Sequence, residues 1–319
     1  MSLALSTRPP AASPPERAAP KGLLGRHRKL SEQELSAVFE LEGLCVAKDA
    51  LRLKLEPSTL SGRTGNRFCD FTWRDGEVLV GFLGIYQWQP GQAELTGMVL
   101  PSHRRLGIFS AMFEAAFGEL RRRATPSCLL VMDRSSVTAR HFAIGRGASY
   151  DHSEHHMSQL RAPLELEAIA GLCIRPATSA DGAFVRECYM ATFGDHLGAS
   201  SDLWSASGTT MQLIELHELP VGVLRIDRSR LEGERSAGIY GFGVMPEHQG
   251  RGIGRRALGA VTRSLRKEGI EQIHLEVAVS NDAALKVYES CGFDRVGTDD
   301  YYEIRTSALV SDEKHPSRT

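Results

Sequence analysis

The chain has 319 residues, of which 42% are hydrophobic and 24% are charged, a composition typical of water-soluble globular proteins. Its length suits two cores of about 150 residues better than one. A formal net charge of −1 provides no overall attraction for nucleic acid or for an anionic membrane, so we expect neither partner. No apolar stretch approaches the roughly 20 residues that span a bilayer.

The cysteines and the two ends of the chain indicate the compartment. Six cysteines are scattered without a Cys-x-x-Cys pair, which is typical of free thiols in a reducing compartment and suggests neither a disulfide framework nor a zinc site. Residues 1–22 are rich in proline and lack the apolar segment of a secretion signal. We therefore expect a cytoplasmic protein with a disordered leader at 1–22 and a disordered tail at 311–319.

The first half predicts a mixture of helices and strands. Ser31 and Glu34 form the pattern of a capping box, which predicts a helix that begins after Ser31. Apolar residues at helical spacing predict a second helix at 108–123. A hairpin-like turn at 74–76 joins two of the strands. The strands expected in this half are 67–73, 77–86, 94–99, 127–132 and 150–159, with a further helix at 136–146.

The second half repeats this order after a connector near 162–170. A Gly/Ser-rich region at 194–207 interrupts it and could form a helix and loop. We expect strands at 173–175, 210–216, 220–227, 238–244, 272–279 and 301–305, and helices at 179–192, 254–267 and 283–289.

The two halves also share one sequence register. Pro101 lies 145 positions before Pro246, and the same offset continues without a gap to Gly147 and Gly292. A chance match would not hold one register over such a span, so we interpret the chain as two copies of one supersecondary unit. We place the first copy at 23–161 and the second copy at 162–310.

The glycine-rich segment from Gln249 to Gly254 follows a predicted strand and opens a helix. Glycines at the start of a helix let the backbone approach a ligand closely, and the amide groups of the first helical turn favour an anion. Arg251, Arg255 and Arg256 add positive charge at this point. The segment therefore predicts a pyrophosphate site.

This order of elements resembles the GNAT superfamily of acyl-CoA-dependent N-acetyltransferases. The (Gln/Arg)-x-x-Gly-x-(Gly/Ala) signature of that superfamily is matched by Gln249, Gly252 and Gly254, and Ser-Asn-Asp-Ala-Ala-Leu-Lys-Val-Tyr-Glu-Ser-Cys-Gly-Phe follows at 280–293. The resemblance covers the second half and, more loosely, the first half. It implies the α/β, mixed-sheet acyl-CoA N-acyltransferase fold in two tandem copies. In that fold the fourth and fifth strands diverge, and the pantetheine arm of acetyl-CoA lies between them.

The resemblance also implies an activity: transfer of the acetyl group of acetyl-CoA to a primary amine of a small molecule or peptide. Tyr288 matches the general acid that protonates the leaving thiolate, and packing in the core is its alternative role. Glu276 matches a proposed general base of the ribosomal-protein N-terminal acetyltransferases, and partial burial would raise its pKa. A glutamate on an exposed strand face, or a water chain in place of a base, is the alternative to that role.

The remaining site residues would hold the cofactor, acetyl-CoA, and no metal is expected. A backbone N–H near Val244 would stabilise the oxyanion of the tetrahedral intermediate. Asn281 would bind the pantetheine arm or cap the following helix. The residues expected to bind the cofactor are Phe242, Val244, Gln249, Gly250, Arg251, Gly252, Ile253, Gly254 and Asn281.

The first copy lacks these catalytic partners. The offset of 145 places Ala143 at the position of Tyr288, Val131 at that of Glu276, Ser136 at that of Asn281 and Phe109 at that of Gly254. We expect a catalytically silent copy that supports the fold, shapes the cleft or binds CoA without turnover. A candidate second CoA site comprises Val99, Arg104, Arg105 and Gly107.

One further pattern in the first copy is the alternation of His152, Glu154 and His156 on a predicted strand, which places the three side chains on one face. Such a face could bind a metal, but histidines on a surface strand without a metal are commoner.

The sequence leaves the acceptor amine and the oligomeric state, monomer or homodimer, open. The alternatives are a tandem enzyme of the mycothiol-synthase type and a non-catalytic acyl-CoA-binding regulator. We expect the acceptor to be selected by 194–207 and by the corresponding region at 55–66.

Overall fold

The computed structural model describes residues 21–89, 91–165, 167–194, 209–228 and 235–307. Most of the leader expected at 1–22, all of the tail expected at 311–319 and all but Gly194 of the region 194–207 lie outside these described residues. None of the helices in the described ranges has the length and apolar character needed to cross a membrane.

The strands of the described chain form one mixed sheet of twelve strands, in the order β1-β2-β3-β4-β5-β12-β6-β11-β10-β9-β8-β7. Exchanging each strand for its counterpart in the other copy reproduces this order reversed, so the two copies are related by an approximate twofold axis. The strands of the first copy are β1 (Leu23–His27), β2 (Asp70–Asp75), β3 (Val78–Gln89), β4 (Gln92–Val99), β5 (Ser127–Asp133) and β6 (Ser149–Gln159). Those of the second are β7 (Leu172–Pro176), β8 (Thr209–Leu216), β9 (Leu219–Arg228), β10 (Ser236–Val244), β11 (Gln272–Ala278) and β12 (Phe293–Arg305).

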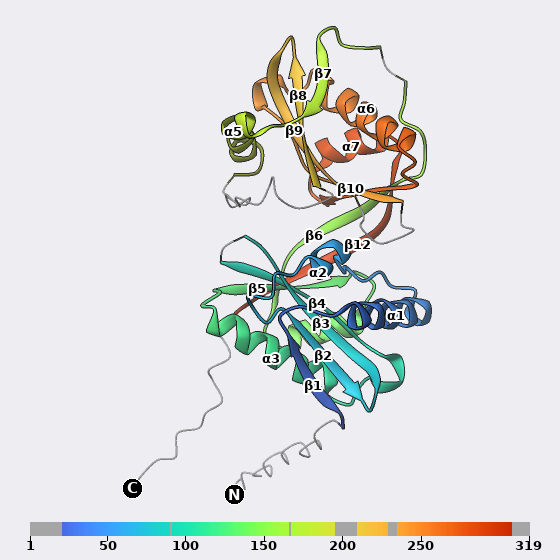
Figure 1. The fold of residues 1–319 in the computed structure, drawn as a ribbon, viewed down its shortest axis with the longest axis vertical. Helices are drawn as coiled ribbons and strands as arrows, with labels where there is room; N and C mark the ends of the chain where they lie inside the picture. Colours follow the sequence, from blue (N-terminus) through green and yellow to red (C-terminus); the bar gives the residue numbers. More distant parts are fainter. Residues whose placement is uncertain (1–20, 90, 166, 195–208, 229–234, 308–319) are drawn as a thin grey trace, which may run out of the picture.

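The last strand of each copy is exchanged between the copies. β12 pairs antiparallel with β5 of the first copy, β6 pairs antiparallel with β11 of the second copy, and β6 and β12 pair with each other. Figure 1 shows both strands crossing between the two halves of the molecule. Tyr302 and Ile304 of β12 lie in the core of the first copy, and Met157 of β6 lies in that of the second. Backbone pairing and core packing therefore both join the copies.

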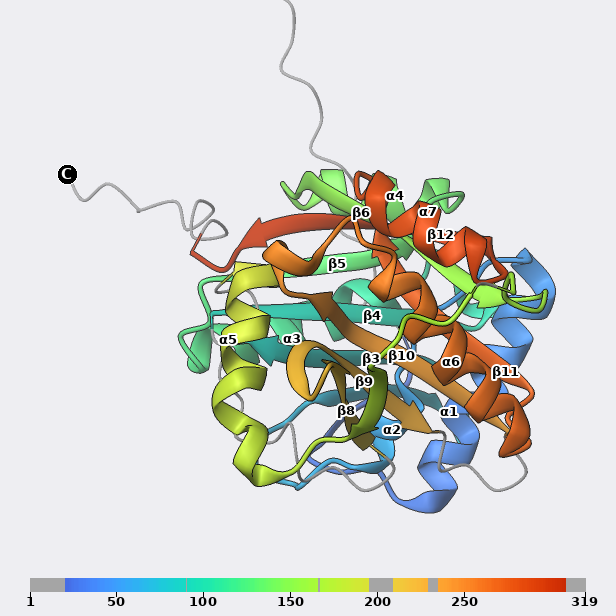
Figure 2. The ribbon, with the colours of Figure 1, turned by 90° about the horizontal axis from the view of Figure 1, so that it is seen from above.

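Helices cover both faces of each half. In the first copy α3 and α4 pack on one face and α1 and α2 on the other. In the second copy α6 and α7 share one face and α5 covers the other, and Figure 2 shows α5 and α6 on opposite sides of β9 and β10. The helices are α1 (Glu32–Asp49), α2 (Pro57–Ser61), α3 (Ile108–Arg122), α4 (Val137–Gly145), α5 (Gly182–Phe193), α6 (Ile253–Lys267) and α7 (Asp282–Ser290).

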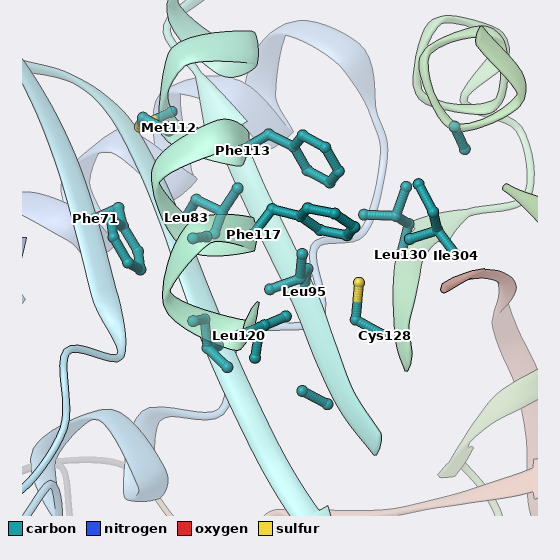
Figure 3. Packing of buried hydrophobic residues seen from close by; sticks show 14 of the residues in the cluster. Phe71, Leu83, Leu95, Met112, Phe113, Phe117, Leu120, Cys128, Leu130 and Ile304 are labelled. Carbon is teal, nitrogen blue, oxygen red and sulfur yellow. The ribbon is translucent and has the colours of Figure 1, made fainter. Parts of the chain in front are cut away.

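The core of the first copy shows how the exchange is sealed by side chains. Phe113 and Phe117 project from α3 onto the sheet, and their rings stack with centroids 5.2 Å apart. Figure 3 shows the ring of Phe117 facing Leu130 of β5, with Ile304 of the exchanged β12 beside it. Side chains of both copies therefore bury apolar surface in this core, and this burial stabilises the exchanged arrangement.

The predicted elements are confirmed to within a few residues at most of their ends. The capping box is present, since the amide of Glu34 donates to Ser31 Oγ at 3.3 Å and the amide of Ser31 donates to Glu34 Oε2 at 2.8 Å. β12 is longer than predicted and begins at Phe293. The short edge strand β1 and the five-residue α2 were not predicted, because elements of that length carry little periodicity.

Candidate active site

In the glycine-rich loop between β10 and α6, no side chain of Gly250 or Gly252 covers the backbone, so a ligand could approach it closely. Gly250 and Gly252 have φ angles of 72° and 75°, in the left-handed region that favours glycine. Gln249 Nε2 donates to the carbonyl oxygen of Val244 at 2.9 Å and so ties the loop to the end of β10. Gly252 is the N-cap of α6 and provides no side-chain cap, and the first turn carries no acidic residue. The first turn of α6 thus offers amide donors to an anion.

The arginines of this loop differ in their partners. Arg251 is exposed, and its guanidinium lies 3.3 Å from Nδ1 of His248. Arg256 turns to the connector between the copies, where its Nε donates to the carbonyl of Glu167 at 2.6 Å. Arg251 is therefore the more available of the two for an anion at the start of α6.

Three other predicted cofactor residues lie around the same end of β10. Ile253 is buried in the core of the second copy, and Phe242 and Val244 pack against that core. A Cβ atom added to Gly254 would meet the Phe242 ring at 3.4 Å, an ordinary contact. The protein itself therefore leaves room for a side chain at position 254.

β10 and β11 diverge beside this loop. Their parallel pairing ends at Ile239 and Leu275, although both strands continue. β10 also contains a bulge, because its register against β9 shifts between Tyr240 and Gly243. Within the described sheet, the β11-facing backbone of β10 has no ladder partner after Ile239. Such an edge can pair with an extended ligand, as the resemblance implies for pantetheine.

Tyr288 and Asn281 belong to α7 and its N-terminus. Tyr288 is 8% exposed, and its ring centroid lies 6.4 Å from that of Phe242. Burial raises the pKa of Tyr288 to about 12, so the hydroxyl keeps its proton at neutral pH. Asn281 Oδ1 accepts a hydrogen bond from the amide of Ala284 at 3.1 Å. Asn281 therefore caps α7, one of the two roles that the sequence leaves open.

Glu276 lies on the opposite face of the sheet. Strand alternation in β11 directs it away from the core under α6 and α7. Its carboxylate is bound by two cations of the first copy, Lys54 Nζ at 2.8 Å and Arg52 at 3.3 Å. Nδ1 of His156, in the exchanged strand β6, lies 3.8 Å away.

These neighbours decide the ionisation of Glu276. Burial by itself would raise its pKa, but Lys54, His156 and Arg52 together hold the pKa well below its usual range. This is the opposite of the raised pKa that partial burial predicts from the sequence. A carboxylate held in this way takes up a proton less readily than a free one.

Arg52 and Lys54 come from the extended segment 51–56, Leu-Arg-Leu-Lys-Leu-Glu, between α1 and α2. Leucine alternates with charge in this segment, so the two kinds of side chain point to opposite sides. Leu53 and Leu55 pack with α1 and α2. The charged side chains turn to the central strands instead. This alternation is the sequence signal that could have identified the segment as part of a site.

The ammonium of Lys54 lies among acidic side chains from both copies. Lys54 is 8% exposed, and its Nζ donates to the hydroxyl of Tyr301 in β12 at 2.6 Å. Glu94 of β4 lies 3.8 Å from the same nitrogen, and Glu154 of β6 lies 3.7 Å from it. Together with Glu276, these groups form an ion-pair cluster on the face of the sheet that α1 and α2 cover.

Glu56 ends the same segment and is a site residue that motif reasoning misses. It is the N-cap of α2, but its side chain makes no capping hydrogen bond. Burial and the nearby anion of Glu276 raise the pKa of Glu56 to about 7, with Glu94 adding to the effect and Lys54 and Arg52 opposing it. The sequence points to 55–66 only as a region that contacts the acceptor.

The first copy retains the loop conformation of the second. Arg105 and Gly107 have φ angles of 66° and 88°, as Gly250 and Gly252 have in the second copy. Arg104 Nε donates to the carbonyl oxygen of Val99 at 3.0 Å, which is the counterpart of the bond from Gln249 to Val244. The backbone of the candidate second CoA site is therefore preserved.

The surroundings of that loop are different. The pairing of β3 with β4 is regular from Gly81 and Val99 to Ile85 and Leu95, so β4 lacks the bulge of β10. Phe109 and Phe142 pack edge to face, with ring centroids 4.9 Å apart, and join α3 to α4. Arg104 is also held by Asp49 at 2.6 Å. Aromatic side chains and an ion pair thus occupy the surroundings of the first loop.

The alternating residues of β6 share one face, as predicted. His152 stacks on Tyr301 with ring centroids 4.1 Å apart, while Glu154 and His156 join the ion-pair cluster. In the part of the chain that the structure describes, no group of three His, Cys, Asp or Glu side chains is arranged to hold a metal ion.

Comparison with known proteins establishes the family. The family model described as Acetyltransferase (GNAT) family matches residues 36–145 and 183–293, more than half of the chain. The chain belongs to the GNAT family. It is therefore an N-acetyltransferase in which both copies match the family pattern.

Two relatives of this GNAT protein match it over nearly their full length, and both are named mycothiol acetyltransferase. The protein from Stackebrandtia nassauensis is 26% identical over 307 residues, which cover 86% of this chain and 97% of the relative. The protein from Thermomonospora curvata is 26% identical over 293 residues, which cover 86% and 95%. A shorter match to N-alpha-acetyltransferase RimI of Mycobacterium tuberculosis is 48% identical over 59 residues, 18% of this chain and 35% of the relative.

Solved structures share the fold. A GCN5-related N-acetyltransferase from Sphaerobacter thermophilus superposes with a TM-score of 0.71 and 16% identity, covering 89% of this chain and 96% of that chain. A tandem GNAT protein from the clavulanic acid biosynthesis pathway gives 0.68 and 16%, covering 93% and 100%. The predicted GNAT fold in two tandem copies is confirmed.

Proposed function

We propose that this protein transfers the acetyl group of acetyl-CoA to a primary amine and that the second copy performs the transfer. The observation that carries the proposal is the divergence of β10 from β11 at a bulge. Among the described residues, this opening is accompanied by the glycine loop of α6 and by the buried Tyr288 in the second copy alone. In the first copy β4 and β5 also stop pairing, after Leu95 and Leu130, and the loop is present, but the bulge and the tyrosine are not.

The residues of the second copy have separate roles in binding acetyl-CoA and in transferring its acetyl group. Loop amides and the first turn of α6 would hold the pyrophosphate of acetyl-CoA, and the unpaired edge of β10 would hold its pantetheine arm. The amine nitrogen bonds to the thioester carbonyl carbon, and the backbone N–H near Val244 stabilises the oxyanion. When the carbon–sulfur bond breaks, Tyr288 donates its proton to the thiolate, and solvent restores that proton.

Glu276 marks the side from which the amine approaches. Because Lys54 and Arg52 keep it ionised, its carboxylate is better suited to attract the acceptor ammonium than to remove a proton from it. To act as the general base predicted from the sequence, Glu276 would first have to lose its contact with Lys54.

The two relatives that match over nearly their full length indicate which acceptor amine to test first. Both match this chain over 97% and 95% of their own lengths and are named mycothiol acetyltransferase. The amine that mycothiol acetyltransferases acetylate is therefore the first acceptor to test, ahead of other small-molecule and peptide amines.

The experiment incubates the full chain with acetyl-CoA and a panel of primary amines, and chromatography with mass detection measures CoA and the acetylated product. Direct detection of CoA is needed because a thiol-bearing acceptor would react with thiol reagents. We expect CoA release that depends on one class of amine. Tyr288→Phe should lower kcat by about 100-fold without changing the Kd of acetyl-CoA, since only the proton donor is lost.

The exposed Tyr150 provides the matched control, and Tyr150→Phe should leave kcat unchanged. If acetyl-CoA raises the Tm of the protein but no amine releases CoA, the chain is an acyl-CoA-binding regulator and the proposed function is wrong.

A further inference from the structure

We infer that the first copy supplies the general base for the reaction of the second copy, and that this base is the carboxylate of Glu56. The inference rests on the proposed function and deepens it, because a proton must leave the amine on the acceptor side. It begins from the position of segment 51–56, which crosses from the first copy to the opening between β10 and β11.

Segment 51–56 is fixed over the central strands by its charged residues. The amide of Arg52 donates to Asp133 Oδ2 of β5 at 3.1 Å, and its guanidinium bonds Asp299 of β12 and Glu276 of β11. Lys54 binds the same Glu276 at 2.8 Å. With the intervening leucines packed on α1 and α2, the segment is held from both sides.

Glu56 lies two positions after Lys54 and therefore on the same side of the extended segment. Its carboxylate is within electrostatic range of Glu276 in β11 and of Tyr240 in β10. These two residues are the first beyond the last paired rung of the diverging strands. Because Lys54, two residues earlier, binds Glu276 at 2.8 Å, segment 51–56 brings Glu56 to the side of the sheet on which β10 and β11 diverge.

The ion-pair cluster gives Glu276 and Glu56 different protonation behaviour. Lys54 and Arg52 bind the carboxylate of Glu276 and keep it ionised. The raised pKa of Glu56, about 7, leaves its carboxylate able to accept a proton near neutral pH, which suits a general base. In the step, one N–H proton of the ammonium passes to Glu56, and the freed electron pair forms the bond to carbon. A second N–H proton leaves the nitrogen of the tetrahedral intermediate to solvent as the carbon–sulfur bond breaks and the amide forms. Solvent then takes the proton from Glu56.

Other titratable groups on this face are poorer bases. Burial and the proximity of His156 lower the pKa of His274 to about 4, so its neutral imidazole attracts a proton weakly. Tyr240 and Tyr86 also face Glu56, and burial raises the pKa of each, so both hydroxyls stay protonated.

The test replaces Glu56 in the full chain. Glu56→Gln should lower kcat by about 100-fold and abolish the acidic limb of the kcat/KM profile, which wild type should show near pH 7. The Kd of acetyl-CoA should not change. Glu40→Gln, an exposed site on α1, is the matched control and should keep both the rate and the acidic limb.

Stability supplies an independent readout. The pKa of Glu56 is raised in the folded state, so the folded protein retains this proton after the unfolded chain has lost it, and stability falls as pH rises through the interval from about 4.5 to about 7. Glu56→Gln removes this loss. We expect a higher Tm than wild type at pH 8 and an equal Tm at pH 4, below both pKa values, which also shows that the variant folds.

The outcomes separate the two proposals. Wild-type protein that releases no CoA with any amine overturns the proposed function, and the role of Glu56 falls with it. Active wild type together with an acidic limb that persists in Glu56→Gln overturns the Glu56 assignment alone. If the limb disappears in Glu276→Gln instead, the base is Glu276. Glu56→Asp keeps a shorter carboxylate and should retain the limb at a reduced kcat.

Discussion

At the residue scale, Lys54 is the central cation of the ion-pair cluster on the face of the sheet that α1 and α2 cover. Its buried ammonium is surrounded by Glu94, Glu154, Glu276 and the Tyr301 hydroxyl. Burial alone would lower the pKa of Lys54, but these groups raise it well above its usual value, so it stays charged. A buried charge is tolerated when it is paired and becomes destabilising when its partner is removed.

Lys54→Met should therefore destabilise the protein by about 3–5 kcal/mol at pH 7, because it leaves several carboxylates close together without their cation. Without Lys54 the carboxylates take up protons at higher pH, so the loss should be smaller at pH 5. Urea unfolding at both pH values measures the difference. Lys48→Met, an exposed substitution in the last turn of α1, is the control. Equal unfolding midpoints for Lys54→Met and wild type at pH 7 would show that the ion pairs contribute nothing.

At the element scale, the bulge of β10 is what separates the two copies. Their glycine loops have similar backbone angles, and α3 and α6 both begin at a glycine in the left-handed region. The register of β3 against β4 is regular at the corresponding point, whereas β10 shifts against β9. An additional residue in one strand exposes backbone groups that a regular ladder would use. The strand β10 is predictable from its sequence, but the bulge depends on how it pairs with β9.

Gly241 permits this bulge. Its φ angle is 52°, and a Cβ added there would lie 2.4 Å from the hydroxyl of Tyr189 in α5. Gly241→Ala should cost about 1–3 kcal/mol through overpacking and, under the proposed function, should lower kcat, because the backbone of the bulge must shift. Gly118→Ala, in α3 where an added Cβ meets nothing within 4 Å, should be neutral or stabilising. Unchanged kcat in Gly241→Ala would mean that the bulge does not position the cofactor.

At the scale of the whole molecule, the exchange of β6 and β12 joins the two copies in one continuous sheet. Each copy lends a strand to the sheet of the other, and Tyr302, Ile304 and Met157 carry that exchange into both cores. The same arrangement brings segment 51–56 of the first copy against β11, where Arg52 and Lys54 bind Glu276 of the second copy.

Separate fragments 21–161 and 162–307, produced together, should consequently form a 1:1 complex. Each fragment alone would leave its fifth strand, β5 or β11, without its exchanged partner, and an open strand edge favours association. Size-exclusion chromatography with light scattering gives the stoichiometry, and the full chain is the reference. Two separate monomers would contradict the prediction, because each copy would then close its own sheet.

The sequence by itself determined what depends on neighbouring residues. The repeat at an offset of 145, the capping box at Ser31, most helices and strands and the glycine loop all follow from local pattern, because periodicity and backbone preference act over a few residues. The tertiary structure alone decided which strand pairs with which, because alternation marks a strand but not its partner. It also decided the ionisation of Glu276 and Glu56, since the charges that set their pKa values come from distant strands and from the other copy.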